Sequence, residues 1–334
     1  MKARLKKHWF LVGIAAAWLM SFGFPSLCKS YQKSHLVDGG IALVMFCGAL
    51  TLETSHLFEQ FKNWRAVALS FVMMYGIAPG ILVLLTWPLR WWSNELAPHL
   101  FVGFMILASQ SCTLGSGIVI ATAARGNVAL ALVITIVNSM LSALMTPLIL
   151  KLTLAVQVEF EVLQMIGRLA LIILLPVALG QLVRPIIKAY LAPIRWLPAI
   201  LSQLVILSLI FMAVGTASGW MKRYPWMVLG VLVSTLLLHV IILAVNYALS
   251  TLGSRKIASR RSLAICSSQK TIATGSYIWS KYFPDNPVGG VPLVFYHIVQ
   301  LVFDSLLAHW LAQRDTHAAP STLETLSKAE ERQA

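Results

Sequence analysis

Charged residues are scarce in this chain of 334 residues: they make up 11% of it, against 58% hydrophobic residues. Soluble domains carry about 25% charged residues, so this composition predicts an integral membrane protein rather than a soluble domain. Acidic residues are scarcer than basic ones, 12 against 26, which gives a net charge of +14. The basic residues are scattered between apolar segments rather than gathered on one face. This pattern argues against a nucleic-acid partner and suits a membrane topology.

Cysteine is also rare, and catalytic motifs are missing. The four cysteines lie within or next to apolar segments without a Cys-x-x-Cys pair, so neither a disulfide framework nor a zinc site is expected. The sequence has no His-Glu-x-x-His, Gly-x-Ser-x-Gly or P-loop pattern and no paired-carboxylate or Cys/His constellation. We therefore expect no enzyme and no metal or cofactor, apart from Na⁺ or H⁺ as a coupling ion.

Long apolar stretches dominate what is present. A stretch of about 20 such residues crosses a bilayer as a helix, so they predict an all-α, multi-pass membrane protein with ten spans. The second span is the shortest, and the fourth and ninth are interrupted by polar residues. The first is interpreted as an uncleaved helix rather than a signal peptide. The predicted spans are Phe10–Leu27, Val37–Thr51, Ala66–Leu85, His99–Ala123, Asn127–Leu152, Val162–Val183, Leu197–Ala217, Trp226–Ser250, Ile257–Tyr282 and Val288–Leu311.

The distribution of basic residues predicts the orientation of these spans. With the N-terminus in the cytoplasm, the loops on that side carry twice as many Lys and Arg residues as the opposite loops. Both termini are therefore expected in the cytoplasm, and a bacterial inner membrane is the expected location. We expect one membrane domain over residues 1–314, and a disordered cytoplasmic tail over 315–334 because that segment is polar and poor in aromatics.

The two interrupted spans fall at matching positions of two halves of five helices, residues 8–153 and 160–312. An odd number of helices per half gives the second half the inverted orientation, and matched interruptions indicate the binding site of a transporter. The first interruption is Ser111–Gly117 and the second is Cys266–Thr271. The alternative explanation of the first is that small residues let helices pack closely.

Lys270 is the most informative residue, because a lysine at bilayer depth costs at least about 2.5 kcal/mol and is by default functional. Asp304 in the last span is its expected counter-charge, and a structural ion pair without a role in transport is the alternative. A desolvated Lys270 that loses its proton would instead act as a proton carrier. In the turn after the fourth span, Gly126 permits a positive φ, and Asn127 is expected to cap the next helix.

Other polar residues at bilayer depth complete the candidate substrate- and ion-binding set. Asn138 is expected either to bond another helix or to line a cavity. The full set is Thr113, Gly115, Ser116, Gly117, Thr135, Asn138, Ser267, Ser268, Gln269, Lys270, Thr271, His297, Gln300 and Asp304.

Four patches of the sequence resemble the bile acid:sodium symporter superfamily, and most closely its divergent bacterial branch of bile-acid-symporter-like proteins, which also contains a vertebrate orphan member. Cys266–Thr271 is similar to the branch's Cys-Ser-x-x-Lys-Ser, and Pro292–Gln300 resembles its Tyr-His-x-x-Gln. The resemblance extends to about Arg314. The two less specific patches are Met45–Glu53 and Gly115–Ile120 with Arg125–Leu130.

The resemblance implies a fold of two inverted five-helix repeats, arranged as a core and a panel domain, with crossed, discontinuous fourth and ninth helices in the core. In sodium-coupled members, a Ser-Asn pair at the first crossover and a glutamate at the second help to hold sodium. Here Ser116-Gly117 replaces the pair, and the ninth span has no acidic residue. Thr135 and Gln269 fall near polar ligands of the family. Uptake that is not strictly sodium-dependent is therefore expected, with Lys270 as a tethered cation.

Together these features predict a secondary transporter that moves an organic anion, bile-acid-like or another small carboxylate or sulfate, by alternating access. The expected partners are this anion and the lipid bilayer, and the oligomeric state stays open. The prediction of an anion depends on half-helix N-termini and on Lys270 facing the cavity. The alternative is a membrane regulator or scaffold that keeps a transporter fold without transporting.

Overall fold

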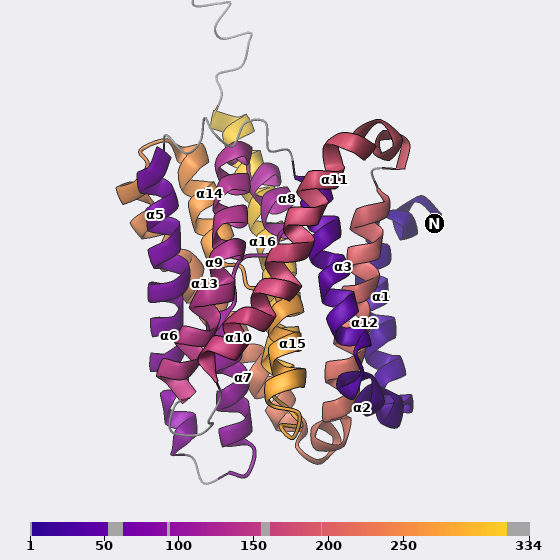
Figure 1. Cartoon of the computed structure of the whole chain (residues 1–334). Coiled ribbons are helices and arrows are strands. Elements are labelled where there is room, and N and C mark those ends of the chain that lie inside the picture. Colours follow the sequence, from indigo (N-terminus) through magenta and orange to yellow (C-terminus); the bar gives the residue numbers. More distant parts are fainter. Residues whose placement is uncertain (1, 53–62, 92–93, 155–160, 195, 319–334) are drawn as a thin grey trace, which may run out of the picture.

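The computed structural model describes residues 2–52, 63–91, 94–154, 161–194 and 196–318, and within these ranges the chain is helical and contains no strand. The helices pack into a bundle (Figure 1). The first part of the chain forms α1 (Lys2–Gly23), α2 (Pro25–Lys33), α3 (Leu36–Thr51), α5 (Trp64–Val72), η2 (Met73–Ile77), α6 (Ala78–Thr86), η3 (Trp87–Arg90), α7 (Ala97–Ser109), α8 (Ser116–Ala123) and α9 (Val128–Leu154). The second part forms α10 (Val162–Leu169), η4 (Ala170–Leu174), α11 (Leu175–Leu191), η5 (Ala192–Ile194), α12 (Leu197–Arg223), α13 (Pro225–Gly253), α14 (Ile257–Ser268), α15 (Ile272–Tyr282) and α16 (Val291–Ala318).

Within the described ranges, six helical stretches are long and apolar enough to cross a membrane, and seven if the bent pair α1–α2 counts as one span. The multi-pass, all-helical prediction is therefore confirmed in its coarse form. Fewer than ten spans meet this length criterion because α3 has only 16 residues and the predicted fourth and ninth spans are each divided into two shorter helices.

The predicted first span was wrong at its end. Residues Trp9–Gly23 and Pro25–Lys33 form two helices that meet at 103°, so the straight segment stops at Gly23 instead of Leu27. Pro25 lies at the start of α2, where its missing N–H is no loss, and proline does not continue a preceding helix.

The two interrupted spans cross at their interruptions. The chain leaves α7 at Gln110 and resumes as α8 at Ser116, while α14 and α15 are separated by three residues. Figure 1 shows that the two spans run in opposite directions, since α7 and α15 lie toward one end of the bundle and α8 and α14 toward the other. The N–H of Thr271 donates to the carbonyl of Ser111 at 2.8 Å, which confirms that the two interruptions lie together.

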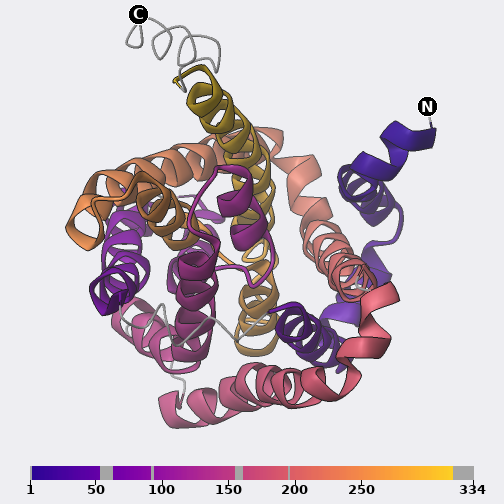
Figure 2. The same cartoon turned by 90° about the horizontal axis from the view of Figure 1, so that it is seen from above.

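The helices around this crossing form two groups (Figures 1 and 2). Helices α1, α2 and α3 pack with α12 on one side of the bundle, and α11 packs against α3. On the other side, α5, α6, α14 and α16 pack against α13. The start of α1 and the end of α16 lie toward the same end of the bundle (Figure 1).

The turn after α8 has its positive φ at Arg125, at 54°, and not at Gly126. Gly126 is needed for space instead, because a Cβ there would lie 2.6 Å from Oγ of Ser262. Asn127 caps α9 as predicted, since its Oδ1 accepts from the N–H of Leu130 at 3.0 Å. The predicted tail lies outside the described residues from 319 onward, and 315–318 continue α16.

Candidate functional site

Side chains from the crossing itself satisfy the backbone groups that the interrupted helices leave free. Gln110 and Gln269 are both extended at the C-terminal ends of α7 and α14, with ψ of 149° and 145°. The Gln110 amide donates to the carbonyl of Ile106 at 2.8 Å, and its Oε1 accepts from Thr274 at 2.6 Å. The carbonyl of Ser109 accepts from Thr146 at 2.8 Å. Such partners are required because a buried, unpaired backbone group costs as much as a lost hydrogen bond.

The ammonium group of Lys270 completes this backbone arrangement. Lys270 is 1% exposed, and its Nζ donates to three backbone carbonyls, those of Met74 at 3.1 Å, Ala108 at 3.1 Å and Gln110 at 2.9 Å. An ammonium group has three donors, so every one of them has an acceptor. Two of the acceptors belong to the C-terminal end of α7, where the helix dipole favours a cation.

The predicted pairing of Lys270 with Asp304 was wrong. Asp304 instead accepts from Gln269 and lies 2.7 Å from Nε2 of His239, and the Lys270 ammonium contacts neutral carbonyls. Lys270 is also not among the residues that line the central cavity, contrary to expectation. The physical reason is that two carbonyls at the end of α7 and the Met74 carbonyl in η2 provide three acceptors at once, more than a single carboxylate already in contact with His239 and Gln269.

Gln300 on α16 holds the extended residue Lys270 by its backbone. The Oε1 of Gln300 accepts from the Lys270 N–H at 2.8 Å, and its Nε2 donates to the Lys270 carbonyl at 2.9 Å. The same Nε2 lies 3.1 Å from Nδ1 of His297. Because this amide nitrogen is a donor, Nδ1 of His297 accepts, and the ring proton lies on Nε2.

Gln269 joins the two interrupted spans by its side chain. Its Oε1 accepts from the hydroxyl of Thr113 at 2.7 Å and from that of Ser116 at 3.2 Å. On the other side, its Nε2 donates to Oδ2 of Asp304 at 3.0 Å. A Cβ at Gly117 would lie 3.2 Å from the Gln269 oxygen, so a glycine gives this side chain room.

Sequence reasoning missed His239 on α13, which is 0% exposed. Its Nε2 lies 2.7 Å from Oδ1 of Asp304, and its Nδ1 lies 3.2 Å from the hydroxyl of Tyr296. An ionisable residue in the middle of an apolar span of 29 residues is the signal that would have found it. Gln110, inside the predicted fourth span, was missed as well.

A cavity of about 500 Å³ lies between the two groups of helices. One wall comes mainly from α3 and α12 and is largely apolar, with Thr51, Ser202 and Gln203 as its polar side chains, while the opposite wall is formed by the crossing and α16. The Nε2 of His297 is buried, has no hydrogen-bond partner and belongs to a residue that lines this cavity. The predicted site residues that line it are Thr113, Gly115, Ser116, Thr271 and His297.

The remaining predicted site residues lie away from the cavity. Asn138 bonds another helix, because its Nδ2 donates to Oγ of Ser70 on α5 at 3.0 Å. Thr135 is buried, and its hydroxyl lies 3.8 Å from Sγ of Cys112. The hydroxyl of Ser268 donates to its own helix, at the carbonyl of Ile265, and that of Ser267 is buried without a partner.

A larger hollow of about 650 Å³ contains none of the predicted site residues. It is lined mainly by apolar side chains of α6 and α9, among them Leu84 and Leu152, which are 74% and 84% exposed. Its position on the outside of these helices separates it from the crossing. No cluster of His, Cys, Asp and Glu suited to a metal ion occurs in the part of the chain that the structure describes.

These features define an integral, multi-pass membrane protein built around two crossed, interrupted helices. The chain belongs to the SBF-like CPA transporter family, whose pattern matches residues 8–313. It is 29% identical over 299 residues to the uncharacterized protein PA2026 of Pseudomonas aeruginosa, covering 86% of this chain and 88% of that one. It is 27% identical to YfeH of Escherichia coli, named as a symporter, over 82% of this chain and 83% of that protein.

A vertebrate relative supports the predicted resemblance. Sodium/bile acid cotransporter 7 of Mus musculus is 21% identical over 334 residues, which cover 93% of this chain and 95% of that protein. The family, YfeH and sodium/bile acid cotransporter 7 are named as transporters and not as enzymes. The resemblance to the bile acid:sodium symporter superfamily is therefore confirmed, and this protein is a membrane transporter.

Proposed function

We propose that this protein is a secondary active transporter that moves an amphipathic organic anion by alternating access. The observation that carries the proposal is the cavity beside the crossing, with a largely apolar wall on α3 and α12 and a few donors, at the helix ends of the crossing and on His297, opposite it. An apolar wall accommodates the body of an organic molecule, and a few directed polar groups orient its head. A bile-acid-like molecule and a smaller carboxylate or sulfate both have this chemistry.

The donors on the polar wall favour an anionic head. Helices α8 and α15 begin at the cavity, and neither Gly115 nor Thr271 at their N-caps makes a side-chain capping bond. In the first turn of α8 the N–H of Gly117 donates to Oγ1 of Thr113 at 3.1 Å, so the other N–H groups of these two helix ends would contact an anion. Free N–H groups and the helix dipole attract an anion at such an end. His297 adds a neutral donor, its Nε2–H, which has no partner within the protein. No Lys, Arg, Asp or Glu lines the cavity, so these uncharged donors would carry the recognition.

The opposed directions of the two interrupted spans support an architecture of inverted repeats, residues 8–153 and 160–312, in one membrane domain over 1–314. In this proposal α1, α3 and α12 form a panel that moves against the core containing the crossing. The cavity lies between the two, so a relative movement would open it first to one side and then to the other. An even number of spans, ten in this architecture, would place both termini on the cytoplasmic side of a bacterial inner membrane.

Lys270 would replace the coupling sodium of related transporters. Its ammonium group supplies a positive charge to backbone carbonyls at the end of a helix, which is where a bound cation would otherwise be needed. The ninth span has no carboxylate that would complete a sodium site. Uptake would then require no sodium, although the names of several relatives include sodium.

Reconstituted uptake tests the proposal. Purified protein in liposomes is assayed with radiolabelled taurocholate, pyruvate and sulfate, both for net uptake and for exchange against the same unlabelled anion inside. We expect saturable exchange of at least one of these anions, unchanged when choline or potassium replaces sodium. A correctly folded protein without exchange of any anion would favour the alternative of a membrane regulator. Complete loss of uptake without sodium would contradict the role assigned to Lys270.

A further inference from the structure

A histidine and a carboxylate form a buried pair outside the cavity. His239 on α13 and Asp304 on α16 are both 0% exposed, and their side chains meet at 2.7 Å between Nε2 and Oδ1. Ionisable residues inside a membrane bundle are costly, and by default they indicate function. Neither residue lines the cavity or contacts Lys270 through a hydrogen bond, so binding of the anion does not explain the pair.

The neighbouring acceptors determine where the protons of this pair lie. The Ser268 carbonyl only accepts, so the single hydroxyl proton of Tyr296 points to it, at 2.8 Å. The Tyr296 oxygen must then accept from Nδ1 of His239 at 3.2 Å, so Nδ1 carries a hydrogen. Because Nδ1 is already protonated, the short contact between Nε2 and Oδ1 requires one further proton between the two side chains.

The site is suited to a proton and not to a metal cation. Hard cations are held by several oxygen ligands. Here nitrogen atoms already lie against both carboxyl oxygens: Nε2 of the His239 ring at Oδ1, and the donor Nε2 of Gln269 at Oδ2, 3.0 Å away. A sodium ion would have to displace both side chains to reach Asp304.

The geometry points to a new role: His239 and Asp304 bind the proton whose movement drives transport. The inference rests on the proposed function, to which it adds the coupling ion. In the structure the pair holds the proton, as imidazolium and carboxylate or as neutral imidazole and carboxylic acid, with a net charge of zero in either form. When the site opens, this proton leaves to water. Asp304 remains a carboxylate, and His239 keeps one hydrogen, so the pair then has a charge of −1.

Loss of the proton would be transmitted to the crossing by Tyr296. The one hydrogen left on His239 moves to Nε2, where it continues to donate to the carboxylate. The vacated Nδ1 becomes an acceptor, and the Tyr296 hydroxyl turns toward it from the Ser268 carbonyl. Ser268 is the last residue of α14, directly before Gln269 and Lys270. Proton release therefore removes a hydrogen bond from the end of the interrupted helix that forms the polar wall.

The pair has few charged neighbours to compete for the proton. Helix α8, which packs against α14 and α16, has no titratable residue in Ser116–Ala123. Lys270 and Arg261 bond backbone carbonyls. Besides the pair, the titratable and charged side chains on α13, on α14, between α14 and α15 and on α16 up to Arg314 are Tyr247, Arg260, Arg261, Cys266, Lys270, Tyr296, His297, His309 and Arg314. Helix α5, which packs against α13 and α14, and η2, which packs against α14, add Arg65 and Tyr75. The opposite ends of α7, α12 and α15 carry His99, Lys222, Arg223 and Lys281.

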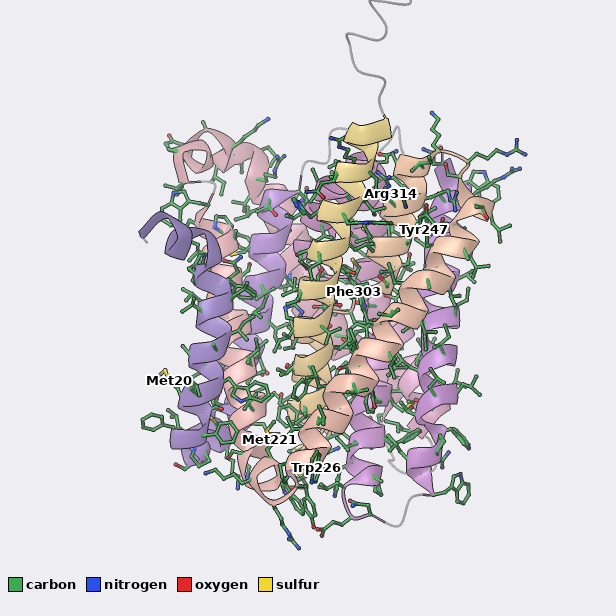
Figure 3. The ribbon with its side chains drawn as sticks, turned by 180° about the vertical axis from the view of Figure 1, so that it is seen from behind. Met20, Met221, Trp226, Tyr247, Phe303 and Arg314 are labelled. Carbon is green, nitrogen blue, oxygen red and sulfur yellow. The ribbon has the colours of Figure 1, made fainter. Side chains whose placement is uncertain are left out.

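The pair lies well inside the bundle, and Asp304 is next in the chain to a residue that lines the cavity. Figure 3 shows Phe303 about halfway along α16, with Arg314 toward one end of the bundle and Trp226 toward the other. The Phe303 ring lies 5.8 Å from the His239 ring, edge to face. Phe303 directly precedes Asp304 in the chain. The next residue, Ser305, lines the cavity. A small displacement of α16 or the panel would give water from the cavity a short path to the carboxylate.

Two measurements test the inference, and the first needs no substrate. Solid-state NMR of ¹⁵N-histidine protein in lipid, with His239 assigned through His239→Gln, reports the hydrogens on the ring nitrogens. At neutral pH we expect a hydrogen on Nδ1 of His239, and as the pH rises we expect the hydrogens on the His239 ring nitrogens to change. In Asp304→Asn the His239 ring should stay neutral at every pH. A wild-type His239 with hydrogen on Nε2 alone, unchanged with pH, would overturn the inference even if the protein transports.

The second measurement uses liposomes with entrapped pyranine, a pH indicator, and taurocholate, pyruvate and sulfate as probes. In the wild type an imposed pH gradient should drive accumulation of the transported anion, and anion flux should move protons. Asp304→Asn should keep anion exchange but lose pH-driven accumulation. The matched control is His309→Gln, a polar and partly exposed histidine on the same helix, which should retain both activities.

The outcomes separate the two proposals. If the wild type exchanges none of the three anions, the proposed function fails and the NMR measurement still decides the proton site. If Asp304→Asn accumulates the anion on a pH gradient like the wild type, or if only a sodium gradient drives the wild type, the inference fails while transport stands. Should Asp304→Asn not fold, Tyr296→Phe replaces it: it leaves the pair intact, and fewer protons should move per anion.

Discussion

The ammonium nitrogen of Lys270 lies 2.9 Å from the carbonyl oxygen of Gln110, so a lysine of the second interruption caps the backbone of the first. The contact joins positions 160 residues apart in the chain. It places the amino group of a lysine at the C-terminal end of α7, where the helix dipole favours a cation, while the N-terminal ends of α8 and α15 face the cavity. Lys270 therefore organises the crossing without lining the cavity.

Replacing Lys270 by methionine should abolish transport and lower stability. Three buried carbonyls lose their donor, and one unsatisfied buried group costs about 1–3 kcal/mol. The variant should still insert, with a lower midpoint of thermal unfolding. The midpoint is measured in detergent with a thiol-reactive dye, since all four cysteines are buried. Lys270→Arg should also impair uptake, because a planar guanidinium does not place three donors like a compact ammonium.

The same experiment distinguishes this arrangement from a Lys270–Asp304 ion pair. Since the two side chains share no hydrogen bond, the stability losses of Lys270→Met and Asp304→Asn should add in the double variant, within the about 0.5 kcal/mol typical of independent sites. A double variant markedly more stable than this sum would mean that the two charges compensate each other.

Removing the lysine side chain should create a response to sodium. Lys270→Ala leaves three carbonyl oxygens around an empty space, and oxygen ligands suit a hard cation. Sodium chloride should then raise the unfolding midpoint of Lys270→Ala above that in choline chloride, by mass action on the folded state. The wild type should show no difference between the two salts. Equal stabilisation of both proteins by sodium would reveal a separate sodium site and contradict the role of Lys270 as its replacement.

His297 should act on the affinity for the anion rather than on folding. In the His297 ring, Nε2–H is a donor without a partner, while Nδ1 accepts from Gln300. His297→Phe keeps a ring of similar size and removes the donor. A neutral hydrogen bond contributes about 0.5–1.5 kcal/mol, so the half-saturation concentration in exchange assays should rise by about two- to tenfold. His309→Gln is the control, and an unchanged half-saturation in His297→Phe would remove His297 from the anion site.

The sequence was sufficient to predict the apolar spans and both interruptions, because apolar length and polar residues at depth are local signals. Thr113, Ser116 and Gln269 were predicted as site residues, and the structure brings them together. The partners of charged groups were not predictable in the same way. Lys270 bonds backbone carbonyls, and carbonyl groups are present at every position, so no residue type in the sequence marks them as a cation site.

Two further differences have local physical causes. The bend after Gly23 depends on Pro25, a residue that also occurs inside continuous helices, so the sequence alone did not define where the span ends. His239 was overlooked because a single histidine in a span of 29 residues hardly changes its mean hydropathy. Its partner Asp304 is 65 positions away, and only the packing of α13 against α16 brings the two together.

The position of α7, which supplies two of the carbonyls bound by Lys270, depends on a close approach at Gly103. A Cβ added there would lie 2.6 Å from the backbone oxygen of Gly289 and 3.1 Å from Pro292 at the start of α16. A backbone oxygen cannot move aside as a flexible side chain would, so Gly103→Ala must shift α7 or the segment before α16. Overpacking of this kind costs about 1–3 kcal/mol. We expect a clearly lower unfolding midpoint and, because the carbonyls of Ala108 and Gln110 shift with α7, reduced anion exchange.

Gly80→Ala on α6 is the matched control, since nothing lies within 4 Å of its added Cβ and alanine favours a helix over glycine. Gly80→Ala should be as stable as the wild type or more so, and equal behaviour of the two variants would show that contact between Gly103 and Gly289 does not position α7.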